Sequence, residues 1–336
     1  MTTSIGTRRR AATGLGLALT LSMTACGGNL GGGSSDGADF PDGNPISIYV
    51  GQDPGGSTDL IGRALADGAT ADLDVAITVE NIPGANGTLA ARQLEGDRAD
   101  GHTLMIFNGS LAYITPLAVS ESEAVDIEDF EIVSGLSQDD YVLVTAANSG
   151  FETIDDLAEA DRSITYGTTG VGTGSQLSQA ALFAQADIES TAVPFDGGSP
   201  TLTAVLGGQV DVGSIQLGEA AAQIEAGELT PIVTFARERP TYLSDTPTAV
   251  EAGYDVEVQQ SRAVFAPKDT PQEVIDALRE SFQTVFDSEV YQNFNTDNQL
   301  TPNEVDGEEL REQWSTNLDT YRSMVEEFDI DMGGAQ

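Results

Sequence analysis

A repeated order of apolar strand, glycine-rich loop and helix is the feature that most restricts how this chain can fold. Residues 46–50 (ISIYV) predict a strand, 54–59 (PGGSTD) a loop, and 60–69 a helix with Thr58 or Asp59 at its N-cap. The same order recurs along most of the chain that follows. Such alternation is typical of α/β folds with largely parallel sheets, so we expect an α/β protein. A length of 336 residues allows one large domain or two of medium size.

The end of the chain predicts an amphipathic helix, because its apolar residues recur at spacings of three and four. They are Leu310, Trp314, Leu318, Tyr321, Val325 and Phe328. Their expected role is packing against the core. The predicted strands span 46–50, 76–81, 102–108, 141–147, 163–167, 190–195, 209–216 and 230–236.

Four glycine-rich loops follow predicted strands: 54–59 (PGGSTD), 83–87 (PGANG), 167–175 (GTTGVGTGS) and 194–200 (PFDGGSP). Open α/β sheets bind ligands at the carboxyl ends of their strands. The N-terminus of the next helix offers free N–H groups and a partial positive charge there. Each loop alone could be a plain turn. Four of them at strand ends favour a site for a small anion that needs no basic side chain.

Nucleotides and metals fit the sequence poorly. Loop 167–175 lacks the lysine of a phosphate-binding P-loop, and its glycine spacing differs from the dinucleotide fingerprint. His102 is the only histidine and Cys26 the only cysteine, so no His/Cys metal cluster can form. The acidic stretches 121–129 and 138–141 lack the calcium-loop pattern and are expected to be solvated surface. We expect no cofactor and no metal.

The charge balance excludes other classes of partner. The chain has 54 Asp plus Glu against 14 Lys plus Arg, a formal net charge of −40, and Lys268 is its only lysine. Nucleic acid and anionic membrane surfaces are therefore not expected partners. Dense carboxylates with so little lysine suggest adaptation to high salt, where charges are screened within about 3 Å at 1 M.

The first residues predict export. Basic residues at 8–10 and an apolar stretch at 11–25 indicate a signal peptide over residues 1–25. Cys26 follows "SMTA", which resembles a bacterial lipoprotein cleavage site, although a chance cysteine after an ordinary signal is the alternative. We expect lipidation of Cys26, a flexible tether over 26–45, no disulfide, and a location on the outer face of the cell membrane. Export by the general or the twin-arginine route is left open.

Five stretches resemble, in order and spacing, the tripartite tricarboxylate transporter substrate-binding proteins, also called the Bug family. They are PGGSTDLIGRALA, VENIPGANGTLAA, YGTTGVGTGSQL, VPFDGGSPTLTAVLGGQVDV and PTAVEAGYDVEV, and the resemblance covers Ile46 to about Phe328. It implies a periplasmic-binding-protein-like α/β fold of two lobes, each with a mixed, mostly parallel sheet, joined by crossing strands. The ligand would lie in the cleft. The expected lobes are 42–142 plus 258–336, and 143–257.

The resemblance also implies a function. Members are exported, non-enzymatic receptors that close over a small mono-, di- or tricarboxylate and deliver it to a two-component membrane permease. They hold the carboxylates by backbone N–H groups, hydroxyls and water. A monomer is expected, and which carboxylate binds is left open. A sensor that signals to a membrane receptor is the first alternative, and a small hydrolase using Ser57 or Ser175 the second.

Ligand-binding residues carried over by the resemblance come from both lobes. In the first lobe they are Gly55, Gly56, Ser57, Thr58, Asn108, Gly109 and Ser110. In the second lobe they are Thr168, Thr169, Gly170, Thr173, Ser175, Phe195, Asp196, Gly197, Gly198, Ser214 and Gln216.

One departure concerns Arg262, in QQSRAVFAPKDT, where the family often has a tryptophan-containing stretch. If Arg262 faces the cleft, it could pair with a ligand carboxylate. A surface arginine in an acidic neighbourhood is the interpretation we favour.

Overall fold

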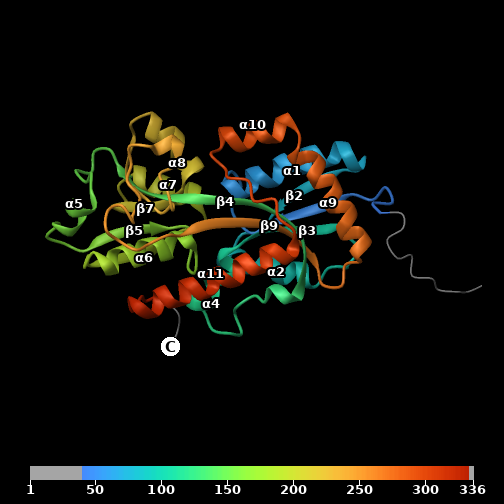
Figure 1. Ribbon diagram of the computed structural model, residues 1–336, viewed down its shortest axis with the longest axis horizontal. Helices are drawn as coiled ribbons and strands as arrows, with labels where there is room; N and C mark the ends of the chain where they lie inside the picture. The colour runs from blue at the N-terminus through green and yellow to red at the C-terminus, as the bar shows by residue number, and fades with distance from the viewer. Residues whose placement is uncertain (1–39, 333–336) are drawn as a thin grey trace, which may run out of the picture. The chain divides into compact units, whose positions relative to one another are not determined.

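A mixed sheet of nine strands runs through residues 40–332, the part of the chain described by this computed structural model (Figure 1). Its strands are β1 (Ile46–Val50), β2 (Ile77–Asn81), β3 (Thr103–Asn108), β4 (Phe130–Ala146), β5 (Ile164–Thr168), β6 (Ser190–Pro194), β7 (Val212–Gln216), β8 (Leu229–Thr234) and β9 (Gln259–Pro267). Their order is β2-β1-β3-β9-β4-β7-β5-β6, with β8 also paired to β4.

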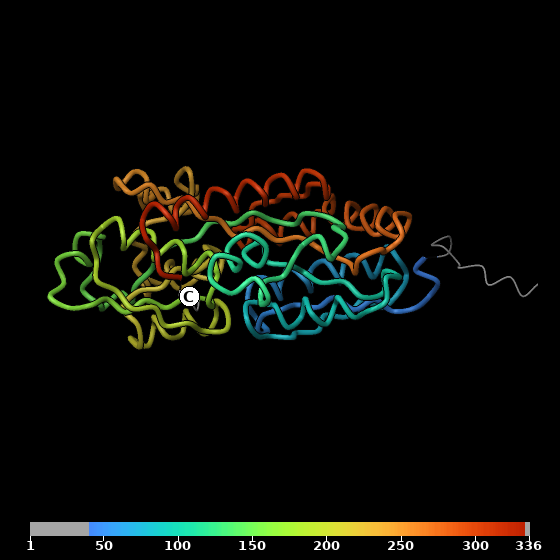
Figure 2. The backbone as a smooth tube through the Cα atoms, turned by 90° about the horizontal axis from the view of Figure 1, so that it is seen from below, coloured from blue at the N-terminus to red at the C-terminus, as the bar shows by residue number. Residues whose placement is uncertain are grey.

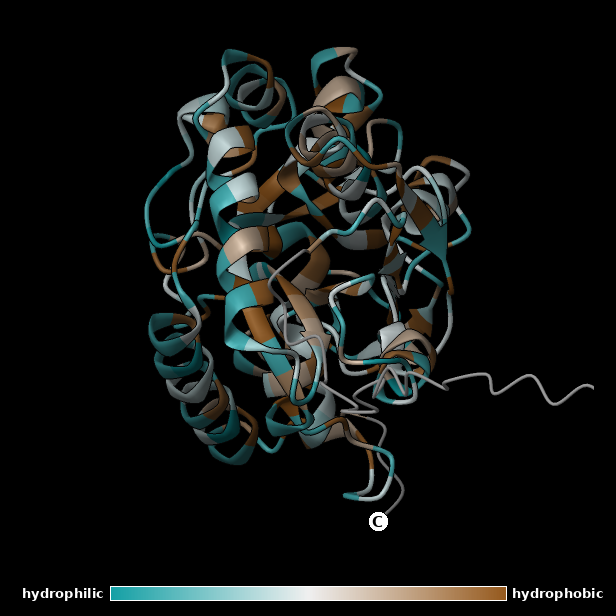
Figure 3. Cartoon of the chain, turned by 90° about the vertical axis from the view of Figure 1, so that its right-hand side faces the viewer, coloured by the Kyte–Doolittle hydropathy of each residue, from teal (hydrophilic) through white to brown (hydrophobic). Residues whose placement is uncertain are grey.

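Helices cover the sheet on its faces. They are α1 (Ser57–Leu73), α2 (Thr88–Glu95), α3 (Ser110–Tyr113), α4 (Thr115–Ala118), α5 (Ile154–Ala158), α6 (Gly174–Gln185), α7 (Gly198–Leu206), α8 (Leu217–Glu225), α9 (Gln272–Phe286), α10 (Glu289–Asp297) and α11 (Gly307–Glu327). Short 3₁₀ turns are η1 (Ala85–Gly87), η2 (Ile127–Asp129) and η3 (Thr241–Leu243). Figure 3 shows the apolar strands inside and the hydrophilic faces of the helices outward.

Strand β4 joins two lobes of the sheet. Residues 130–140 pair with β9, whereas residues 141–146 pair with β7 and β8. The first lobe thus contains β1, β2, β3, β9 and the start of β4, and the second contains β5 to β8 and the end of β4. The outer pairs β1–β2, β1–β3, β5–β6 and β5–β7 are parallel, while every pair made by β4 or β9 is antiparallel.

Apolar side chains hold the helices to the strands on both faces. In the first lobe, Leu65 of α1 and Phe282 of α9 are fully buried against β1 and β3. On the opposite face, Trp314 of α11 stacks on Phe265 of β9 with a centroid distance of 5.5 Å. Helix α11 runs alongside the crossing strands (Figure 2). The predicted C-terminal amphipathic helix is confirmed, and its apolar face packs against the core.

The structure departs from the predicted elements in three ways. Crossing strands do join the two lobes, as the resemblance implied, but their positions at 130–140 and 259–267 were not predicted. Helices α3, α4 and α10 were missed too. The predicted N-cap of α1 is wrong: the cap is Gly56, and Asp59 lies inside the first turn.

The terminal predictions stay predictions. The signal peptide, Cys26 and most of the tether lie outside the described residues. Within residues 40–332, no helix is both long and apolar enough to cross a bilayer. The exact lobe boundaries at 142/143 and 257/258 also remain predictions.

Candidate ligand-binding site

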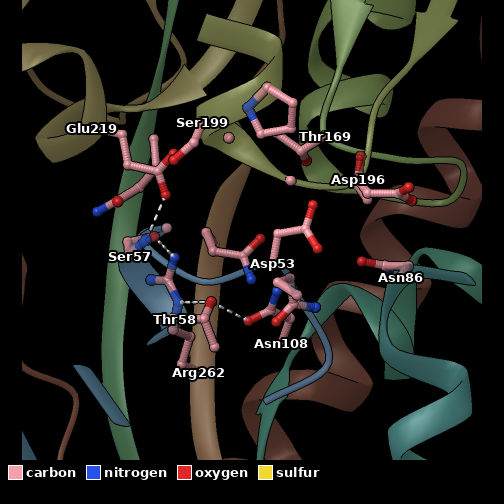
Figure 4. Close-up of a pocket in the computed structure, with 18 of the residues that line it drawn as sticks. Asp53, Ser57, Thr58, Asn86, Asn108, Thr169, Asp196, Ser199, Glu219 and Arg262 are labelled. Atoms are coloured by element: carbon pink, nitrogen blue, oxygen red, sulfur yellow. Dashed lines mark hydrogen bonds between the residues drawn. The ribbon is translucent and has the colours of Figure 1, made fainter. Parts of the chain in front are cut away.

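A pocket with a cavity volume of about 50 Å³ lies between the strand-end loops of the two lobes (Figure 4). Its lining consists of Gln52, Asp53, Gly56, Ser57, Thr58, Asn86, Asn108, Tyr141, Thr169, Thr173, Asp196, Gly197, Gly198, Ser199, Pro200, Gln216, Glu219, Gln260 and Arg262. This volume is room for only a few water molecules, so this arrangement can enclose nothing larger than a small solute.

The first-lobe loop is held rigid by Asp59. Its carboxylate accepts a hydrogen bond from the N–H of Gly55 (2.9 Å) and pairs with Arg63 (2.8 Å), and Asn81 also donates to it (2.9 Å). Burial acts to raise the pKa of this carboxyl, but these three donors together hold it below its ordinary value. The loop is therefore fixed with the N-terminus of α1 facing the pocket.

Glu219 of α8 crosses from the second lobe to that helix N-terminus. Its Oε1 accepts a hydrogen bond from the N–H of Ser57 at 2.7 Å, while its Oε2 is buried with no partner among residues 40–332. A Cβ on Gly198 would lie 1.5 Å from that Oε2, so a larger residue at the start of α7 would force the Glu219 carboxylate to move. A carboxylate of the protein itself thus occupies the space between the N-termini of α1 and α7.

Arg262 lines the pocket and is not a surface residue, so the favoured interpretation of it is wrong. Its side chain is 3% exposed and pairs with Asp139, which is 0% exposed. The guanidinium also donates to Ser57 Oγ (2.6 Å) and Thr58 Oγ1 (3.0 Å). Its positive charge is therefore already balanced, and it serves to fix the hydroxyls of the α1 loop.

Side chains of the crossing strands complete the floor. The hydroxyl of Tyr141 on β4 donates to Gln260 Oε1 on β9. Burial raises the pKa of Tyr141 well above its ordinary value, so the phenol stays neutral. Gln216, at the end of β7, is 4% exposed, and both its Nε2 and Oε1 lack a partner in the described part of the chain. A buried amide without partners is costly, so the amide of Gln216 needs a partner from outside the protein, either water or a ligand.

The second-lobe loops present two helix N-termini. Thr173 caps α6, accepting from the N–H of Gln176 (3.3 Å). Helix α7 begins at Gly198 after Gly197, whose φ of 113° favours glycine. The N–H groups of Gly198 and Ser199, in the first turn of α7, have no acceptor within their own helix.

The structure brings ten of the predicted residues into the pocket lining: Gly56, Ser57, Thr58, Asn108, Thr169, Thr173, Asp196, Gly197, Gly198 and Gln216. Eight others are not in that lining: Gly55, Gly109, Ser110, Thr168, Gly170, Ser175, Phe195 and Ser214. Ser175 illustrates why, since its hydroxyl is fully buried and donates to the carbonyl of Ser214 at 2.6 Å. Such residues shape the loops from beneath.

The sequence prediction missed nine lining residues: Gln52, Asp53, Asn86, Tyr141, Ser199, Pro200, Glu219, Gln260 and, as a lining residue, Arg262. The loop pattern could have found Asp53, Asn86, Ser199 and Pro200, which lie in or beside the four glycine-rich loops. Tyr141, Gln260 and Arg262 lie on crossing strands, where the local sequence gave no such signal.

The geometry disfavours the hydrolase alternative. Ser57 Oγ is hydrogen-bonded to Arg262, and Ser175 Oγ to a backbone carbonyl. His102 precedes β3 and bonds to the carbonyl of Pro45 (3.2 Å), whereas the pocket residue Asn108 ends β3. The six residues of that strand place them about 20 Å apart. The sole histidine is thus too far away to activate a serine in the pocket.

Comparisons with known proteins place the chain among transport receptors. The model of the "Tripartite tricarboxylate transporter family receptor" family matches residues 61–330. A UPF0065 protein of Agrobacterium vitis, from the TAR-I ttuE-ttuC' intergenic region, is 29% identical over 246 residues, which are 72% of this chain and 71% of that protein.

Two solved structures share the fold. Malate-bound MatC from Rhodopseudomonas palustris is 25% identical, with a TM-score of 0.77 over 84% of this chain and 99% of that one. An R. palustris protein with adipate is 22% identical, with a TM-score of 0.82 over 87% and 99% of the two chains. The expected periplasmic-binding-protein-like fold is thereby confirmed.

Proposed function

Because the chain belongs to the tripartite tricarboxylate transporter receptor family, we propose that it captures a small carboxylate outside the cytoplasm and delivers it to a membrane permease of that type. The family and the structural neighbours are solute-binding receptors and not enzymes. The observation that carries the proposal is the pocket itself, which gathers the N-termini of α1, α6 and α7 from two lobes around buried, unpartnered amide groups.

The mechanism is closure of two lobes over the solute. Groups from the first lobe (Ser57, Asn108) and from the second (Ser199, Gln216) line the same pocket, and separation of the lobes would move them apart. A ligand that contacts both sets binds the closed state more tightly, and it therefore shifts the population towards closure. The permease would then recognise the closed, loaded receptor.

The carboxylate class draws support from relatives, since MatC is described with bound malate and a further neighbour with adipate. The di- and tricarboxylates expected from the sequence fall in this class. Helix N-termini suit a carboxylate because their N–H groups and partial positive charge both favour an anion.

Cys26 would anchor the exported receptor by a lipid. Mass spectrometry of the membrane fraction should find a diacylated N-terminal cysteine, and Cys26→Ser should abolish this modification.

A thermal-shift screen tests the proposal. The mature chain in high salt would be heated with carboxylates and amino-carboxylates at a hundredfold excess over the dissociation constant. Binding adds about 2.7 kcal/mol, which raises the midpoint of a chain of this size by roughly 4 °C. If no solute in the panel raises the midpoint, the proposal is wrong.

Gly56→Val should abolish the rise of the thermal midpoint on addition of solute. The branched side chain of valine would crowd the α1 loop and the carboxylate of Glu219, which already lies 3.6 Å from the position of a Cβ. Gly96→Val is the matched control. Gly96 is exposed and lies after α2, away from the pocket lining, and a Cβ there makes only an ordinary contact of 3.5 Å. An undiminished shift in the Gly56 variant would remove this loop from the site.

A further inference from the structure

Glu219 connects the two lobes across the pocket. It belongs to α8 of the second lobe, and its Oε1 accepts a hydrogen bond at 2.7 Å from the N–H of Ser57, the first residue of α1 in the first lobe (Figure 4). A carboxylate on the free N–H groups at the start of a helix is the arrangement expected for a bound anion. The side chain of Glu219 thus lies where a carboxylate of the solute would be held.

This carboxylate is only half satisfied. Its Oε2 is buried and accepts no hydrogen bond from residues 40–332, and it lies 1.5 Å from the position that a Cβ on Gly198 would take. A buried carboxylate oxygen without a donor has lost the hydrogen bonds that water would give it, and this loss is costly. The cost offsets part of the gain from the bond to Ser57, so the carboxylate of Glu219 is held only weakly in the pocket.

The pocket has no spare positive charge for a second carboxylate beside Glu219. Arg262 is the only basic residue among the described residues of the pocket lining, and it is paired with the buried Asp139. Like charges repel most strongly where water is excluded. A solute carboxylate that replaces Glu219 at the N–H of Ser57 adds no net charge to the pocket. Exchange of the two carboxylates is therefore favoured over their coexistence.

A second cavity gives the side chain of Glu219 room to move. It has a volume of about 290 Å³, against about 50 Å³ for the pocket, and it lies between α1 and α10 of one lobe and α7 and α8 of the other. Glu219 lines both cavities, as do Ser57, Ser199 and Gln216. Leu60 in the lining of the second cavity is 39% exposed, so water reaches it. A carboxylate that turned into this cavity would be hydrated, and its departure would enlarge the pocket.

We propose that Glu219 is a displaceable latch. In the receptor without solute, it holds the lobes together through the N–H of Ser57. A carboxylate of the arriving solute takes over that N–H, and the side chain of Glu219 turns into the second cavity. The inference rests on the proposed function and adds a competitor within the protein. Because the latch stabilises only the unloaded receptor, it weakens the affinity for the solute.

The protein without solute tests the latch independently of the identity of the ligand. Glu219→Ala removes the acceptor of the Ser57 N–H, and Glu225→Ala is the matched control, an exposed position on the same helix outside both cavities. Hydrogen exchange followed by NMR should show the amide of Ser57 exchanging at least tenfold faster in Glu219→Ala than in the control. Small-angle X-ray scattering should show a larger radius of gyration, because the lobes separate. An unchanged radius of gyration would overturn the inference.

The affinity for solute is a second measurement, in which two roles of Glu219 give opposite results. Malate and adipate are the probes, titrated calorimetrically in high salt into the unchanged protein, Glu219→Ala and Glu225→Ala. A latch competes with the solute, so Glu219→Ala should bind the probe at least tenfold more tightly. A residue that holds the solute would instead weaken binding when removed.

The outcomes separate the inference from the proposed function. If a probe binds the unchanged protein and Glu219→Ala binds it no more tightly, the inference is wrong and the proposed function stands. If neither probe binds, the scattering result decides the inference and the thermal-shift screen decides the proposed function. Thermal midpoints verify that the variants fold. Glu219→Gln, which keeps the size of the side chain and removes its charge, replaces Glu219→Ala in both measurements if the alanine variant does not fold.

Discussion

Removing Asp139 should destabilise the protein strongly, because this carboxylate is the only counter-charge that Arg262 meets in the described structure. Both side chains are almost completely buried, and Asp139 also accepts from Ser137 Oγ (2.7 Å) and the N–H of Thr301 (2.9 Å). Breaking a buried ion pair by removing one partner typically costs about 3–5 kcal/mol. We therefore expect Asp139→Ala to lose about 4 kcal/mol, or roughly 6 °C in the thermal midpoint for a chain of this length.

The assay is urea unfolding at constant salt, so that the ionic strength does not change along the titration. The control is Asp319→Ala, which removes half of the exposed pair between Arg322 (47% exposed) and Asp319 (76% exposed). Exposed pairs of this kind contribute at most about 1 kcal/mol. The double variant Asp139→Leu/Arg262→Met should recover most of the loss, since no unpaired charge is left inside.

Two results would refute this reasoning. One is a loss for Asp139→Ala no larger than that for Asp319→Ala. The other is a double variant as unstable as the single one. Either result would mean that solvation by water, or a movement of β4, compensates the unpaired charge of Arg262. The ion pair between Arg262 and Asp139 would then not be what holds the crossing strands together.

Three further predictions concern closure, pH and salt. Gly218→Ala places a Cβ 1.8 Å from the carbonyl oxygen of Asn298, at a contact between the lobes. Solute affinity should therefore fall at least tenfold, while Gly96→Ala should leave it unchanged. Equal affinities in the two variants would contradict closure of the lobes. The hydrogen bond from Arg162 is the main cause that lowers the pKa of Asp211 from 3.8 to about 2. A lowered carboxyl pKa stabilises the fold above about pH 4 and loses this effect as the pH falls towards 2. Solvent screening of the half-exposed Arg162 limits this stabilisation of the fold to about 1 kcal/mol. In Asp211→Asn, this contribution should be absent from the curve of stability against pH. Finally, a net charge of −40 predicts that the urea midpoint rises between 0.1 and 2 M KCl, and a flat response would contradict adaptation to salt.

The outer strands and their loops could be predicted because their signals are local. Runs of five to eight residues rich in apolar side chains predicted β1 to β3 and β5 to β8, and all of these runs except 230–236 contain or are followed within three residues by a glycine. The first part of β4 was missed because its register shifts after Ile132 and again after Gly135, so the alternation of apolar and polar residues is broken. At Gly135 a side chain would also strike the carbonyl of Asn303, only 2.2 Å away.

The residues of the site could likewise be predicted where their signals are local, in the strand-end loops. Residues of the strand-end loops, such as Ser57 and Gly198, were found because parallel strands bring their carboxyl ends to one edge. Arg262 was misjudged because its partner Asp139 is 123 residues away on another strand. Nothing in the local sequence of a strand tells whether a charged residue is exposed or paired, since that depends on which strand becomes its neighbour.

The 17 residues of β4 also determine whether the two lobes unfold together or separately. The strand supplies a central row of backbone hydrogen bonds to both lobes, so we expect its two ends to lose their partners together. If one lobe unfolds on heating, the other lobe loses its middle strand. A calorimetric trace should therefore contain one peak, and a fragment that ends inside residues 130–146 should not fold, however intact its own half of the sequence.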